Sequence, residues 1–254
     1  MLTVFEKLCE WAHGITQFNR RQRDMEPCAS SCLTLHQFSE ALGNAVDARD
    51  PHLYSHSRDV AETARVLAAR MGFSRAETEL IHIAGHLHDV GKIGIPDTVL
   101  KKRGALDENE WQWMKQHPEI GAGIVRSVPP FNTSGGVADI ILSHHEQYDG
   151  SGYPQRLSAE AIPVGARIVA VADTLSALVR DRYYRRGCTF DEAFTEISRC
   201  AGTQFDPAVV RTLEINRHEV CELLLAPQTT YDVHFSEQPG QQEKLKLRPQ
   251  ECYS

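Results

Sequence analysis

The chain lacks a long apolar run. None of its 254 residues belongs to an apolar stretch of the ~18 residues that a membrane-spanning helix needs, so we expect no membrane span. The first eleven residues include Glu6, Lys7 and Glu10, and therefore lack the apolar core of an export signal. Without such a signal, we expect a cytoplasmic protein whose seven cysteines are reduced thiols.

Positive charge is also scarce. The 27 lysines and arginines are outnumbered by 34 aspartates and glutamates, which gives a formal net charge of −7. Such a balance argues against broad nucleic-acid binding. A phosphate-bearing substrate would need a local cluster of metal ions or arginines to offset the overall repulsion.

Strand signals are missing as well. No hairpin turn joins two runs of alternating polarity, whereas Val60, Ala64 and Leu67 recur at helical spacing. Residues 74–77, 107–110 and 189–192 have the pattern of a capping box, which marks the start of a helix. These patterns predict an all-α bundle. We expect a partly helical N-terminal extension over residues 1–33 with a loop at 20–31, a catalytic domain over 34–225, and a polar, extended or disordered tail over 226–254.

Two dense polar stretches stand out, one from His144 to Pro154 and one from His88 to Lys92. Adjacent imidazoles followed by a glycine-rich aromatic loop have little packing rationale. Further histidines and one aspartate fall on or at the ends of predicted helices, and helix ends that converge can build a polynuclear metal site in a bundle. The candidate ligands are His56, His88, Asp89, His117, His144, His145 and Asp173.

This donor set indicates metal-dependent hydrolysis. Imidazole and carboxylate ligands without thiolates suit iron, manganese or zinc, and disfavour a closed structural zinc site. An aspartate next to a histidine, as in His88-Asp89, can bridge two ions. Two ions can activate a hydroxide and hold a phosphodiester for in-line attack.

A single histidine is more often a core or surface residue than a ligand. We interpret His82 and His86 in this way, because residue 86 lies two positions from His88 and its side chain points away from the same metal. The vicinal pair His144-His145 is the strongest exception.

These motifs, in this order, resemble HD-GYP phosphodiesterases, a branch of the HD superfamily of metal-dependent phosphohydrolases. The resemblance spans about residues 50 to 210. The stretches that carry it are His88-Asp89-Val90-Gly91-Lys92, Ile93-Gly94-Ile95-Pro96, His117-Pro118-Glu119-Ile120-Gly121, His144 to Pro154, Ala166-Arg167-Ile168, Asp173, Asp181-Arg182 and Gln204-Phe205-Asp206-Pro207.

The resemblance implies an HD-superfamily helical domain that opens c-di-GMP to linear pGpG, and in some members onward to GMP. It implies that the seven candidates bind two iron or manganese ions. Asp89 and Lys92 become the catalytic residues, with Lys92 near the scissile phosphate. Tyr153, Arg182 and Arg185 become the substrate-binding face. The Gly152-Tyr153-Pro154 loop is a candidate for docking a protein partner, and a homodimer is left open.

The sequence departs from the family pattern in places. His52 stands where the family has tyrosine, or glutamate in members that hold three metals, so His52 either ligates a third ion or faces solvent or substrate. Ser176 replaces a common aspartate three residues after Asp173, and Tyr148 replaces a tryptophan. No core ligand is lost, so we expect an active enzyme.

Other interpretations remain open. The substrate could be cGAMP or another nucleotide, or the domain could sense c-di-GMP or dock a partner without catalysis. The pairs Cys9–His13 and Cys28–Cys32 are each spaced by four residues and could form a zinc or redox site, although ordinary thiols are the simpler interpretation. Cys188, Cys200 and Cys221 fit helical patterns and are expected to pack as small core residues.

Overall fold

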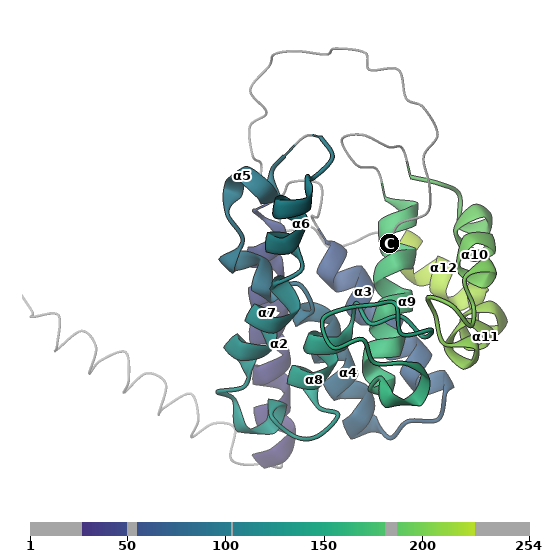
Figure 1. Cartoon of the computed structure of the whole chain (residues 1–254). Helices are drawn as coiled ribbons and strands as arrows, with labels where there is room; N and C mark the ends of the chain where they lie inside the picture. The colour runs from purple at the N-terminus through teal and green to yellow at the C-terminus, as the bar shows by residue number, and fades with distance from the viewer. Residues whose placement is uncertain (1–26, 50–54, 103, 181–186, 227–254) are drawn as a thin grey trace, which may run out of the picture.

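The computed structural model describes residues 27–49, 55–102, 104–180 and 187–226, with the backbone alone for residues 27–34. This part of the chain is helical, and its extended pairing is limited to an isolated bridge between Ala201 and Phe205. The expected all-α fold is confirmed (Figure 1). The elements are α2 (Pro27–Asp47), α3 (His56–Arg70), α4 (Arg75–Leu87), η2 (Val90–Gly94), α5 (Asp97–Leu100), α6 (Glu108–Met114), α7 (His117–Val125), η3 (Pro129–Phe131), α8 (Val137–Ser143), η4 (Ala159–Ala161), α9 (Val164–Val179), α10 (Phe190–Arg199), α11 (Pro207–Ile215) and α12 (Arg217–Leu225).

The helix starts follow the local sequence signals. Ser74, Asp107 and Thr189 each accept a hydrogen bond from the backbone N–H three residues later, while the glutamate at that position accepts from the cap residue. These are the three expected capping boxes. Asp206 caps α11 through the N–H of Ala208. Local polar side chains therefore satisfy donors that the first helical turns leave free.

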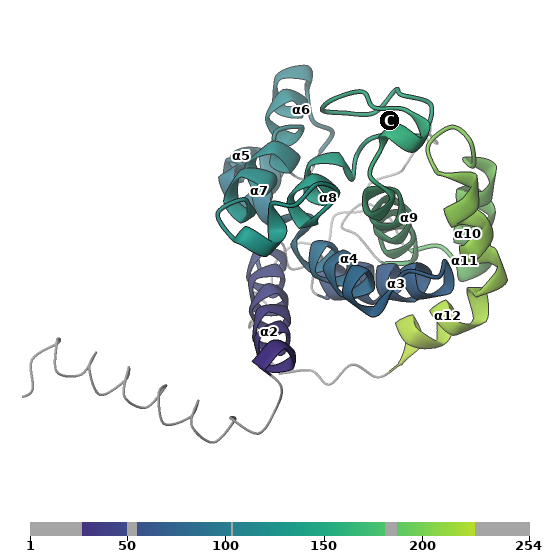
Figure 2. The same ribbon diagram turned by 90° about the horizontal axis from the view of Figure 1, so that it is seen from below.

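The core lies between α3, α4 and α9. Val60 and Leu67 of α3 are fully buried, and they face Ile168 and Leu175 of α9 in one apolar cluster. Figure 2 shows α9 between the α3–α4 pair on one side and α10 and α11 on the other, with α2 outside α4. The candidate ligands lie on α9 and at the ends of α3, α4, α7 and α8.

Helix α2 begins earlier than the sequence indicated. The loop expected at residues 20–31 is wrong for residues 27–31, which form the first turns of α2. Proline is compatible with a helix start at Pro27, and these first turns continue directly into the part of α2 that packs against α4 at His36. The expected boundary between residues 33 and 34 falls inside this helix. At the other end, α12 ends at Leu225, where the polar tail was expected to begin.

In the described ranges, no helix is long and apolar enough to cross a membrane. Cys188, Cys200 and Cys221 pack against the core at partial exposure, where core positions were expected. Cys9 and His13 lie outside the described residues, as do the side chains of Cys28 and Cys32.

Candidate metal centre

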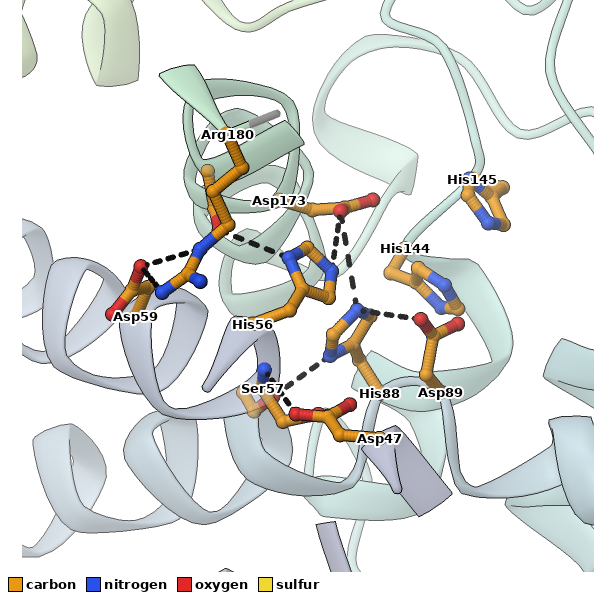
Figure 3. Close-up of polar contacts among 12 residues, drawn as sticks. Asp47, His56, Ser57, Asp59, His88, Asp89, His144, His145, Asp173 and Arg180 are labelled. Atoms are coloured by element: carbon orange, nitrogen blue, oxygen red, sulfur yellow. Dashed lines mark hydrogen bonds and ion pairs between the residues drawn. The ribbon is translucent and has the colours of Figure 1, made fainter. Parts of the chain in front are cut away.

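Five helices deliver the candidate ligands to one point. His56 is the first residue of α3 and His117 the first of α7, while His88 and His144 directly follow α4 and α8. Asp173 lies on α9, the central helix. Asp89 and His145 are the chain neighbours of two of these histidines. All seven candidates are brought together, and Figure 3 shows six of them around a common centre.

The ligands form two groups of three. His56, His88 and Asp173 present one ligand atom each, all within 4.8 Å of one another. His117, His144 and His145 form the second group by the same measure. Three converging donors can hold one ion each, so the geometry offers two metal positions.

Asp89 lies between the two groups. Its Oδ1 is 3.4 Å from His117 Nε2, and its Oδ2 is 3.3 Å from His88 Nε2. The two oxygens of one carboxylate therefore face different groups. This is the position that a ligand bridging two ions needs.

The backbone fixes the orientation of three imidazoles in the same way. Nδ1 of His88, His117 and His144 each lies 2.7–2.8 Å from the carbonyl oxygen three residues earlier, in Gly85, Met114 and Ile141 respectively. A carbonyl can only accept, so Nδ1 donates and Nε2 is turned towards the site. Such a partner fixes the ring and the tautomer of a metal-binding histidine.

His56 uses a side chain instead. Its Nδ1 lies 2.9 Å from Ser176 Oγ, and its Nε2 lies 3.2 Å from Asp173 Oδ1. Ser176 is fully buried on α9. The residue that departs from the family pattern thus positions a candidate ligand.

The donor set fits a bound cation. His117 Nε2 lies 3.3 Å from His144 Nε2, although both rings already donate through Nδ1. Two neutral rings would then point lone pairs at each other, which is unfavourable unless a positive charge lies between them. Buried His88 Nε2 likewise has only a long contact of 3.3 Å, to Asp89 Oδ2.

Burial controls the charge of the second group. It lowers the pKa of His117 to about 3 and that of His145 to about 4, with repulsion between charged neighbours as a further cause. It also holds the pKa of His144 well below its usual value. These imidazoles are neutral at physiological pH, which is the form that binds metals.

The first group is more polar. Burial alone would lower the pKa of His88, but the carboxylates of Asp89 and Asp173 outweigh it and raise this pKa to about 9. Burial would raise the pKa of Asp89, yet Lys92 and His88 hold it well below its usual value. In the absence of metal, a proton on His88 therefore takes the place of a cation between two carboxylates.

Lys92 lies beside the Asp89 carboxylate, with Nζ 2.6 Å from Oδ2. Its short helix η2 is held by Arg49, whose Nη1 donates to the Lys92 carbonyl at 2.6 Å. Gly91 lets η2 approach α7, because a Cβ there would lie 1.9 Å from the His117 carbonyl oxygen. The lysine is thus placed by α2 and α7 together.

The loop after His145 is closed by a buried glutamate. Glu146 is 4% exposed and accepts the backbone N–H groups of Gln155 at 2.6 Å and Leu157 at 3.0 Å. Gly152 packs against the start of the same loop, where a Cβ would lie 2.2 Å from the Gln147 nitrogen. These contacts fix the path of the loop along one side of the site.

Tyr153 of this loop faces the candidate ligands. Its ring stacks on His145 at 4.9 Å between centroids, and Lys115 Nζ lies 5.7 Å from the centre of the Tyr153 ring. His52, Arg182 and Arg185 lie outside the described residues. Their neighbour Arg180 is anchored to Asp59, with Nε 2.8 Å from Oδ2 (Figure 3).

Sequence reasoning missed several supporting residues. Asp47, at the end of α2, is buried and accepts from both the backbone N–H and the hydroxyl of Ser57, which fixes the start of α3 at His56. Glu146, Ser176 and Lys115 were likewise given no role. A carboxylate before a helix start, such as Asp47, is a weak sequence signal. The roles of Glu146, Ser176 and Lys115 depend on long-range partners, so no local sequence pattern indicates them.

Comparison with known proteins places this geometry in context. Residues 40–209 match the model of the family described as HD domain. The chain is 43% identical over 173 residues to the cyclic di-GMP phosphodiesterase response regulator RpfG of Xanthomonas campestris, covering 68% of this chain and 45% of that protein. It is 41% identical over 177 residues to a cyclic di-GMP phosphodiesterase of Thermotoga maritima, covering 69% of this chain and 48% of that protein. The chain thus spans about half the length of these relatives.

A second substrate class occurs among the relatives. A 3'3'-cGAMP-specific phosphodiesterase 2 of Vibrio cholerae is 39% identical over 173 residues, covering 68% of this chain and 33% of that protein. Among solved structures, a cyclic GMP-AMP-specific phosphodiesterase of V. cholerae superposes with a TM-score of 0.60 at 20% identity, covering 76% of this chain and 51% of the other. At that identity the likeness shows the fold alone.

Proposed function

Because the chain belongs to the HD domain family, we propose that it is a metal-dependent phosphodiesterase that hydrolyses c-di-GMP to pGpG, with hydrolysis of pGpG to GMP left open. The resemblance to HD-GYP phosphodiesterases drawn from the motifs is confirmed. One observation carries the proposal: two groups of three ligands share the carboxylate of Asp89 between them.

The proposed cofactors are two divalent ions, iron or manganese. His56, His88 and Asp173 would hold one ion, His117, His144 and His145 the other, and Asp89 both. When bound, such ions supply a nucleophile at neutral pH and neutralise charge on the phosphodiester. A third ion at His52 stays a prediction.

The protein side chains would bind and orient the substrate. Lys92, held 2.6 Å from Asp89, can stabilise negative charge that develops on the reacting phosphate. Tyr153 offers an aromatic face beside the ligands, and Lys115 adds a positive charge next to it. Arg182 and Arg185 are proposed to bind phosphate through bidentate hydrogen bonds, which compensates for the overall charge of −7.

The runner-up substrate is 3'3'-cGAMP, because a relative of similar identity carries that specificity in its name. A non-catalytic sensor is not favoured, since the ligand set is complete. Docking through Gly152-Tyr153-Pro154 and a homodimer stay predictions. The Tyr153 ring packs on His145 rather than projecting as a free docking group.

The test is anaerobic purification of the full chain, elemental analysis, and product analysis with c-di-GMP and 3'3'-cGAMP in parallel. We expect at least two bound ions per chain and faster turnover of c-di-GMP to pGpG. Faster turnover of cGAMP would support the runner-up, and no turnover of either would overturn the proposal.

Asp89→Asn is the matched variant, because it keeps the shape of the side chain and removes the bridging charge. We expect this variant to lower turnover by more than about 100-fold. A loss of that size is the most that removing an outer hydrogen-bond partner of a metal ligand causes. Full metal occupancy with unchanged turnover in this variant would contradict the role of Asp89.

A further inference from the structure

A second histidine cluster lies on the other side of α4. His82 and His86 are one helical turn apart on α4, and His36 reaches them from α2. The ring centroids lie 4.6 Å apart for His36–His82, 4.9 Å for His82–His86 and 5.4 Å for His36–His86. One ring nitrogen from each lies within 4.8 Å of the others.

The rings of this cluster have unmet hydrogen-bonding capacity. His82 is 4% exposed and His86 2% exposed. His82 Nδ1 and His86 Nδ1 have no hydrogen-bond partner among the described residues, and His82 Nε2 has only Glu62 Oε1, at 3.3 Å. A neutral imidazole carries one donor and one acceptor, and leaving them unpaired in the interior is costly. A ligand that accepts nitrogen lone pairs would remove this cost.

Carboxylates complete the surroundings. Glu62 Oε2 pairs with Arg65 at 2.8 Å, while Oε1 lies 3.3 Å from His82 Nε2. Glu79 Oε1 lies 3.3 Å from His36 Nδ1. The side chains of His36 and Glu62 are 21% and 28% exposed, which leaves an entry path for an ion. Three imidazoles and one carboxylate form a donor set typical of tetrahedral zinc.

We propose that His36, His82 and His86, with Glu62 as fourth ligand, bind one zinc-type divalent metal ion separate from the catalytic centre. His88, two residues after His86, turns the other way and faces Asp89 and Asp173. The interpretation of His82 and His86 from sequence considered the catalytic metals only, and it had no reason to connect them with His36.

The ion would link three helices: α2 through His36, α3 through Glu62 and α4 through the histidine pair. Helix α2 also supplies Asp47, which caps α3 at His56, and leads into Arg49, which holds the Lys92 carbonyl. The site would therefore fasten the helix that supports both a candidate ligand and the candidate catalytic lysine.

The experiment separates this site from the catalytic one. Metal-free full-length chain is dialysed against Zn²⁺ and analysed for bound metal as wild type, His36→Gln, and His218→Gln. The last is a matched control, because the His218 side chain is 86% exposed and outside any cluster. We expect His36→Gln to bind one equivalent less than wild type, and the control to bind the same. Equal zinc content in wild type and His36→Gln overturns the proposal.

Two further measurements remove ambiguity. In an Asp89→Asn background the catalytic ions are weakened, so Co²⁺ should report the new site through the strong visible bands of tetrahedral cobalt, and adding His36→Gln should abolish them. Zinc should also raise the Tm of wild type but not of His36→Gln. If His36→Gln fails to fold, Glu62→Gln replaces it, with weaker zinc binding expected. Bands or a zinc-dependent Tm rise that persist in the folded variant contradict the assignment, whatever the outcome for hydrolysis.

Discussion

Ser176 shows how a single buried hydroxyl can orient a candidate metal ligand. It lies 2.9 Å from Nδ1 of His56, whose other nitrogen faces Asp173. Where the family has an aspartate, this chain has a neutral partner, which should orient the ring without adding charge. The serine therefore changes the strength of the hydrogen bond that orients His56, while His56 keeps its position.

We expect Ser176→Ala to weaken metal binding about 10–100-fold, because a metal ligand that loses its outer hydrogen bond is no longer held in one orientation. Competition with a chelating dye measures this affinity. Ser176→Thr, which keeps a hydroxyl, should restore most of it. Ser198→Ala is the control, since that hydroxyl pairs with Glu214 on the far helices. An affinity equal to wild type in Ser176→Ala would exclude the positioning role.

The candidate ligands were predictable from the sequence, and the residues that support them were not. His56, His88, Asp89, His117, His144, His145 and Asp173 carry recognisable chemistry at recognisable spacing, and the structure brings all of them together. Ser176 bonds a residue 120 positions away, and Asp47 one 10 positions away. Such partners are decided by how helices pack, which periodicity does not report.

At the scale of elements, the loop between α8 and α9 depends on Glu146. One carboxylate accepts two backbone N–H groups, from Gln155 and Leu157, and so closes the turn that presents Tyr153. Helix starts were predictable from capping boxes because their signal is local. This closure spans about ten residues and had no signal beyond the glycine-rich composition.

We expect Glu146→Gln to destabilise the protein by about 1–3 kcal/mol, because an amide is uncharged and has one acceptor oxygen, which leaves one of the two partly buried N–H groups unpaired. Hydrogen exchange should accelerate at the Gln155 and Leu157 amides before the helices are affected. Glu160→Gln is the control, because Glu160 is exposed and accepts a side-chain hydrogen bond only from the Tyr148 hydroxyl among the described residues. Unchanged exchange at both amides would show that the loop is closed by other contacts.

At the scale of the whole molecule, stability should depend on pH once metals are removed. The pKa values of His117 and His145, at about 3 and about 4, lie below the 6.5 of an unfolded histidine. Between pH 6.5 and 4 the unfolded chain binds these two protons and the native chain does not. Stability therefore falls as pH falls, by about 1.4 kcal/mol per pH unit for each proton. His88, with its raised pKa of about 9, is protonated in the native state throughout this window and does not oppose the trend.

Urea unfolding of the chelator-treated protein at a series of pH values measures this dependence. The midpoint should drop steadily below pH 6.5, and the drop should be smaller in His145→Gln, which removes one of the buried histidines whose pKa is lowered and leaves His117 and His144. A midpoint that stays constant between pH 6.5 and 4.5 would mean that the buried imidazoles take up protons without unfolding.

The hydrogen bonds from His88, His117 and His144 to the carbonyl three residues earlier also determine where insertions and deletions can occur in the chain. Because an α-helix turns about 100° per residue, one residue inserted within α4, α7 or α8 would rotate the following ligand away from the centre. Residues 132–136, between η3 and α8, include no candidate ligand, and a loop there can lengthen at little entropic cost. Insertions and deletions compatible with activity should therefore be confined to such connections, while the spacing between a helix end and its histidine stays constant.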